Sequence, residues 1–269
     1  MILIFCRGKQ SAHLRLDLSD CTSIQGLSLV SLSSSYSQAS WLSLSGCSSM
    51  SVASLQLLAA PGAVLEGVSE LRLSHLPALS SVQRHNEDGD ALPGLLRASG
   101  LQLQLLHLDG SSLGDETMEC LVEWCRELAE LSIVGCTELS DAGLQLVARG
   151  CQKLRTLAVG GAKGTWSERH GLSCFQGLRS LSISRRSILN DQDFSAVMQR
   201  HHGLHNLRLA GCASITDAGL ASLPADLRKA TFICCDSVSG KGLGRLQALQ
   251  ELRFRDCTRV TAQAVQVRC

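Results

Sequence analysis

Six of the thirteen cysteines recur at regular intervals and are the first residues to consider for chemistry. Thiolates on adjacent rungs of a sheet, about 4.8 Å apart, could bind a metal ion or form redox pairs. No Cys-x-x-Cys occurs, however, and none of the six has a histidine close in sequence. Because free cysteine is among the most buried residue types, we interpret them as structural and expect neither a metal nor a cofactor. They are Cys21, Cys47, Cys136, Cys212, Cys235 and Cys257.

Three further motifs have chemical potential, and each also has a structural explanation. Residues 110–114, Gly-Ser-Ser-Leu-Gly, match the nucleophile elbow of hydrolases with Ser112 as the nucleophile. Residues 240–244, Gly-Lys-Gly-Leu-Gly, lack the Gly-Lys-Ser/Thr ending of a phosphate loop. His201, His202 and His205 could ligate a metal, but we expect them at an exposed corner between a helix and a strand. We therefore predict no catalytic residue and no enzyme.

A repeat supplies the elements that position these residues. The pattern Leu-x-x-Leu-x-Leu-x-x-Cys-x-x-Ile is clearest at 128–139, 204–215 and 249–260. Steps of 22 to 35 residues, most of them below 30, separate its copies, which is typical of leucine-rich repeats. Each strand-turn-helix unit must stack on its neighbours to bury its apolar side. The marker of each copy, the first residue of the inner Leu-x-Leu, is Leu16, Leu42, Leu71, Leu106, Leu131, Leu157, Leu181, Leu207, Ala230 and Leu252.

Ten copies predict one α/β domain over residues 1–269, a leucine-rich-repeat solenoid curved as a right-handed horseshoe with parallel strands on its concave face. Ser140 and Thr216, each followed by aspartate, are expected helix N-caps. The polar insertion at 83–100 predicts a surface loop, and the serine-rich stretch at 31–40 predicts a weak first helix. The repeats start near residues 13, 39, 68, 103, 128, 154, 178, 204, 227 and 249.

Composition narrows the function classes. A chain that is 45% hydrophobic and 18% charged is not intrinsically disordered. The 25 Lys and Arg nearly balance the 24 Asp and Glu, which argues against a dedicated binder of nucleic acid or membrane surfaces. No apolar stretch approaches the roughly 18 residues of a membrane span, so we expect a protein of the cytoplasm, or of the nucleus.

The periodic cysteine resembles the cysteine-containing subtype of leucine-rich repeat, found in F-box leucine-rich-repeat proteins and their stand-alone relatives. In the best copies Ile or Leu and then Ser/Thr-Asp-x-Gly-Leu follow it, and the resemblance extends from about Leu14 to Val265. It implies a substrate-recognition arm of a Skp-cullin-F-box ubiquitin ligase. Only 13 residues precede Leu14, so we expect no F-box within this chain. Contact with a Skp-type adaptor would then require an upstream F-box.

The concave face is where we expect a protein partner to bind, at the strand positions that flank the inward leucines. Trp41 is the aromatic candidate for a hot spot, although it could equally pack under the serine-rich stretch. The basic C-terminal end favours an acidic or phosphorylated partner, with a merely solvated charged face as the alternative. The candidate contact residues are Trp41, Arg72, His107, Arg208, Lys229, Arg253 and Arg255.

These features predict a protein-interaction scaffold that acts as a monomer or as a subunit of a complex. A substrate-recognition or adaptor arm of a ubiquitin ligase is the favoured function. A structural subunit of an axonemal or organellar assembly is the alternative, and a serine hydrolase is the least favoured.

Overall fold

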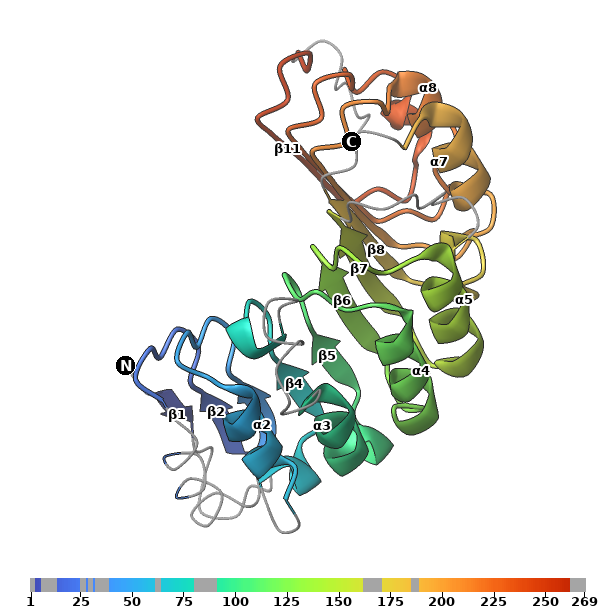
Figure 1. Cartoon of the computed structure of the whole chain (residues 1–269). Coiled ribbons are helices and arrows are strands. Elements are labelled where there is room, and N and C mark those ends of the chain that lie inside the picture. The colour runs from blue at the N-terminus through green and yellow to red at the C-terminus, as the bar shows by residue number, and fades with distance from the viewer. Residues whose placement is uncertain are drawn as a thin grey trace.

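The computed structural model describes residues 3–5, 14–24, 28, 31, 39–60, 64–79, 91–161, 171–184 and 189–261. Its strands form one eleven-stranded sheet in which the order along the sheet equals the order along the chain. Figure 1 shows the sheet on the inner side of an arc and the helices on its outer side. The predicted solenoid of parallel strands and outer helices is therefore confirmed. That residues 1–269 form a single domain stays a prediction.

Each predicted repeat contributes one strand, and from β2 onward all neighbours pair in parallel. The first strand was not predicted: β1 pairs antiparallel with β2, with Ile4 opposite Leu16. It thereby pairs backbone groups that would otherwise form an open sheet edge. The strands are β1 (Leu3–Phe5), β2 (Leu14–Asp17), β3 (Ala39–Ser43), β4 (Glu70–Arg72), β5 (Leu105–His107), β6 (Glu130–Val134), β7 (Thr156–Gly160), β8 (Ser180–Ser184), β9 (Asn206–Ala210), β10 (Lys229–Ile233) and β11 (Glu251–Arg255).

The outer elements begin where the capping residues predict. The hydroxyl of Ser140 accepts a hydrogen bond from the amide of Ala142, and that of Thr216 accepts one from Ala218. No helix within the described ranges is both long and apolar enough to span a membrane. The helices are α2 (Val52–Leu58), α3 (Ala91–Ser99), α4 (Asp115–Trp124), α5 (Asp141–Gly150), α7 (Asp191–Met198) and α8 (Asp217–Leu220), with 3-10 turns η1 (Val64–Gly67), η2 (Pro77–Leu79), η3 (Gly100–Gln102) and η4 (Leu243–Arg245).

The marker positions of the repeat form the core. Nine of the ten, from Leu16 to Ala230, are at most 2% exposed. Burying one leucine side chain contributes roughly 2 kcal/mol, so the column of markers is a main source of stability. Leu252 is only partly buried, since no described strand pairs with the far edge of β11.

The prediction of a surface loop at 83–100 was wrong for its second half. Residues 80–90 lie outside the described ranges, but α3 follows them, and its Leu92, Leu95 and Leu96 are fully buried. Pro93 is compatible with this helix because it lies in the first helical turn, where its missing N–H costs no intrahelical hydrogen bond. The serine-rich stretch at 31–40 lies almost wholly outside the described residues.

Aspartates at the first position of the helices connect each repeat to the next. Asp191 accepts hydrogen bonds from the backbone N and the Oγ1 of Thr216, at 2.7 and 2.6 Å. Asp217 accepts them from the N and Oγ of Ser239 and from the N of Gly240, at 3.0, 2.5 and 3.0 Å. Each carboxylate also lies at a helix N-terminus, where the dipole favours negative charge. These bonds join the start of one outer element to the start of the next.

Candidate functional site

The periodic cysteines bind backbone at the turn after each strand. The thiol of Cys47 donates to the carbonyl of Leu18 in the preceding repeat at 3.0 Å, and Cys235 donates to Leu209 at 3.6 Å. Within the described ranges no group of three or more His, Cys, Asp or Glu is placed to hold a metal ion. The same thiol-to-carbonyl bond recurs at Cys136, Cys212 and Cys257, which supports the structural interpretation for five of the six periodic cysteines.

The surroundings of individual cysteines shift the pKa of their thiols in opposite directions. Cys125 and Cys151 form the second buried column that the sequence indicates, and burial raises the pKa of each to about 12. A hydrogen bond with Cys212 lowers the pKa of Cys235 to about 6. Cys235 is nevertheless fully buried, so its thiolate is shielded from reagents in solution.

The two glycine-rich motifs are turns of the repeat. Gly110 has φ of 73° in the turn after β5, a conformation that favours glycine. No histidine or carboxylate among the described residues hydrogen-bonds the Ser112 hydroxyl. The N–H of Gly240 donates a hydrogen bond to the carboxylate of Asp217, so the loop that resembles a phosphate loop binds a carboxylate of the protein itself.

The expectation of a solvent-exposed histidine corner was wrong for His201. This side chain is 3% exposed, and its Nδ1 lies 2.8 Å from the carbonyl oxygen of Val197. It follows α7 and folds back over the end of that helix, which removes it from water. Burial lowers its pKa. His202 and His205 lie at the surface.

Strand register confirms the concave-face columns derived from alternation. Ser182 of β8 lies beside Arg208 of β9, which lies beside Thr231 of β10. The seven candidate contact residues fall into two groups at opposite ends of the face. Trp41, Arg72 and His107 belong to the N-terminal group, and Arg208, Lys229, Arg253 and Arg255 belong to the C-terminal group.

The N-terminal group is engaged within the protein. Trp41 is only 8% exposed, so of the two alternatives for this ring the packed one agrees with the structure. The guanidinium groups of Arg15 and Arg72 lie 4.8 and 5.7 Å from its ring centroid and cover it. His107 Nε2 lies 2.8 Å from Glu130 Oε1, and this hydrogen bond lowers the pKa of Glu130.

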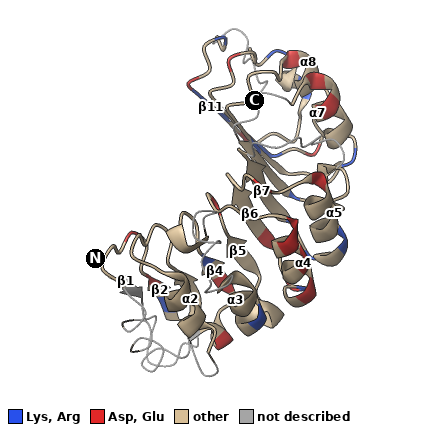
Figure 2. Ribbon diagram, in the orientation of Figure 1, with Lys and Arg blue, Asp and Glu red and all other residues tan. Residues whose placement is uncertain are grey.

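In the C-terminal group one carboxylate pairs with two cations. Glu251 pairs with Lys229 at 3.0 Å and with Arg253 at 2.6 Å, and these partners lower its pKa. Arg208 and Arg255 are exposed and form no ion pair with another described residue. Figure 2 shows acidic residues on the outer helices α4 and α7, away from this inner face.

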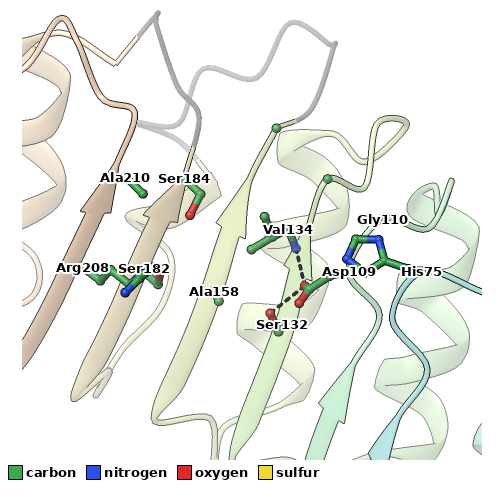
Figure 3. A pocket seen from close by; sticks show the side chains of 12 residues that line it. His75, Asp109, Gly110, Ser132, Val134, Ala158, Ser182, Ser184, Arg208 and Ala210 are labelled. Atoms are coloured by element: carbon green, nitrogen blue, oxygen red, sulfur yellow. Dashed lines mark hydrogen bonds between the residues drawn. The ribbon is translucent and has the colours of Figure 1, made fainter. Parts of the chain in front are cut away.

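Between the two groups the concave face is hollowed. The volume of this concave hollow is about 850 Å³. Figure 3 shows Arg208 and Ser182 toward one end and His75 and Asp109 at the other. Small side chains and glycines form most of the floor between them. The lining residues are His75, Asp109, Gly110, Ser132, Val134, Gly135, Ala158, Gly161, Ser182, Ser184, Arg208 and Ala210.

Asp109 is a fixed anion at its end of the hollow. Its Oδ1 accepts hydrogen bonds from Ser132 Oγ at 2.6 Å and from Val134 N at 2.8 Å (Figure 3). Sequence analysis placed Arg208 and the small residues of β7 and β8 on this face. It did not single out Asp109, although Asp109 lies two positions after His107 on the same alternating side, and it missed His75, which follows β4 in a turn where alternation no longer gives the side-chain direction.

Sequence comparison finds curated proteins that are similar to part of this chain. The "F-box protein MAX2 homolog A" of Petunia hybrida is 33% identical over 131 residues, which cover 46% of this chain and 18% of that protein. The "Putative RNA-binding protein EEED8.10" of Caenorhabditis elegans is 29% identical over 172 residues, 59% of this chain and 23% of that protein. The chain thus spans about a fifth of the length of these curated relatives.

Solved structures show the same fold. A chain of the yeast Rad7 and Elc1 complex matches with a TM-score of 0.63 and 18% identity, over 94% of this chain and 72% of that one. The leucine-rich repeat-containing protein LegL7 of Legionella pneumophila matches with a TM-score of 0.58 and 16% identity, over 89% and 82%. No family model matches the chain. Repeat spacing, strand topology and these likenesses agree that the chain has a leucine-rich-repeat fold, and F-box proteins are among its relatives.

Proposed function

We propose that this chain is a protein-recognition arm that holds its partner in the concave hollow and serves a ubiquitin ligase in the manner of F-box proteins. The observation that carries the proposal is the hollow itself, a volume of about 850 Å³ with a fixed carboxylate at one end and an exposed guanidinium at the other. Such a surface offers ion pairs and hydrogen bonds to a ligand. A hydrolase, the least favoured alternative, would instead need a nucleophile and a base within hydrogen-bond reach of each other.

The sheet makes the hollow a rigid template. From β5 to β9 the strands pair without a register shift, so the lining side chains are spaced by one rung, about 4.8 Å. Sites on regular elements keep their geometry better than sites on loops, which lowers the entropy lost on binding. The F-box relatives support a role in ubiquitin transfer, and the proposal places the protein in the cytoplasm or nucleus.

A blocking substitution on the floor tests recognition. Ala158 lies in register between Ser132 and Ser182, so Ala158→Arg fills the hollow without touching the core. The matched control is Ala225→Arg, at an exposed position in the turn before β10. Partners captured from cell extract and identified by mass spectrometry should be lost with the first variant and kept with the second. Partners that all survive Ala158→Arg would move the recognition surface elsewhere.

The ligase role has its own test in the full-length protein. Co-purification with a Skp-type adaptor or cullin, and a longer half-life of the captured partner when the protein is depleted, are the expected results. A stoichiometric, salt-resistant assembly with unchanged partner turnover would favour a structural subunit instead. Gel shifts with single-stranded RNA test the nucleic-acid function in the name of the C. elegans relative, and we expect no shift.

A further inference from the structure

We infer that the concave hollow binds an extended segment of the partner that carries a phosphorylated serine or threonine, with the phosphate on Arg208. This inference rests on the proposed function and names the ligand of the same site. It follows from the length of the hollow, the chemistry of its floor and the hydrogen-bond donors that its ends leave unused.

The dimensions favour an extended segment. The lining runs from His75, after β4, to Ala210 in β9, which is five rungs or about 24 Å. About seven residues of extended chain span that length at roughly 3.3 Å each. An amphipathic helix would need large apolar side chains around its anchors, whereas small residues such as Gly135, Ala158 and Ser182 form the floor. A peptide backbone can approach such a floor closely.

Around Arg208 several hydrogen-bond donors come together on adjacent strands. The guanidinium is exposed, and in register with it stand the hydroxyls of Ser182 and Thr231, one rung to either side. No hydrogen bond or ion pair to another described residue occupies these three groups. A carboxylate has two acceptor oxygens, whereas a phosphate monoester has three and close to two negative charges. The phosphate therefore matches this set of donors better.

Charges at the two ends fix how the peptide runs. Beyond Thr231 in register lies Arg253, which shares the single Glu251 carboxylate with Lys229, so that end keeps a net positive charge and favours an anion. At the other end, four rungs or about 19 Å from Arg208, Asp109 repels phosphate and attracts a cation. The ligand should therefore carry a Lys or Arg about six residues from its phosphorylated residue.

The test uses degenerate peptide libraries passed over the immobilised chain. In three matched libraries the central residue is fixed as phosphoserine, glutamate or serine, with a lysine six residues away. We expect the phosphoserine library to be retained about tenfold more than either of the others, because charge-assisted bonds to a phosphate dianion are the strongest available. Arg208→Glu should abolish the difference, and Ser182→Ala should reduce it severalfold.

Two controls keep the result interpretable. Arg200→Glu reverses an equally exposed charge just after α7, outside the hollow, and should leave retention unchanged. Arg208→Lys keeps the charge but loses the planar fork, so it should retain the phosphoserine library at an intermediate level even if Arg208→Glu fails to fold. Thermal unfolding of each variant identifies a folding defect.

The outcomes separate this inference from the proposed function. Equal retention of the glutamate and phosphoserine libraries, or phosphoserine retention that survives Arg208→Glu in a folded variant, overturns the assignment of phosphate to Arg208. The proposed function still stands if Ala158→Arg abolishes partner capture. Partner capture that survives Ala158→Arg overturns the proposed function.

Discussion

The carboxylate of Asp217 provides the sharpest test of how successive repeats are joined. It accepts hydrogen bonds from Ser239 N, Ser239 Oγ and Gly240 N, at 3.0, 2.5 and 3.0 Å. Hydrogen bonds to charged groups contribute about 1.5 to 3 kcal/mol each. Because Asp217 is half-exposed and the three bonds share one acceptor group, we take about 1 kcal/mol each. Asp217→Ala should therefore lower the free energy of unfolding by about 3 kcal/mol.

Hydrogen exchange locates the effect. In a solenoid each repeat contacts only its neighbours, so amides after α8, in β10 and β11, should lose protection while those of β5 and β6 keep it. Urea unfolding gives the magnitude, with Asp226→Ala, at an exposed position before β10, as the control. A loss within about 1 kcal/mol of that control, or protection lost evenly along the chain, would refute the reasoning.

Three further predictions concern single side chains. Burial lowers the pKa of His201 below 6.5, so the stability that depends on its neutral imidazole is fully present above the pKa of the unfolded chain and is lost as the pH falls toward the pKa of the folded chain. In thermal unfolding at a series of pH values, His201→Leu should reduce this loss of stability at acid pH. At pH of about 8 a thiol-specific reagent should modify exposed Cys234 and leave native Cys151, whose pKa is about 12, unmodified until the chain unfolds. Gly135→Ala should cost about 1 to 2 kcal/mol because φ is 81° there, whereas Gly203→Ala, with open space around its Cβ, should cost less in denaturant unfolding.

The repeated part of the fold could be predicted from sequence because local and global signals coincide there. Leu131 and Leu157 lie in segments that alternate inward and outward residues and end before a glycine turn. The two leucines recur at the spacing of one repeat, so period, turn and packing all predict a strand at each. The helix starts at Asp141 and Asp217 were predictable for the same reason, since a hydroxyl cap and a first-turn acid are local features.

Features that depend on tertiary contacts escaped prediction. Nothing local distinguishes Trp41 as exposed or covered, because the two arginines over its ring come from neighbouring rungs. β1 pairs with β2 in the opposite sense to the repeat and has no periodic signal of its own. At the candidate site Arg208 was predictable from alternation, whereas His75 required the course of the turn after β4.

Uniform register has an evolutionary consequence for the ligand that the hollow selects. Since β5 to β9 pair without a shift, duplication or deletion of one whole repeat between them would move Arg208 relative to Asp109 by one rung, about 4.8 Å, and leave the floor chemistry intact. The separation of the two charges can therefore change only in discrete steps, each worth about one and a half residues of extended peptide. Duplication of whole repeats would therefore generate paralogues that bind motifs of different lengths, with the lengths differing by fixed steps.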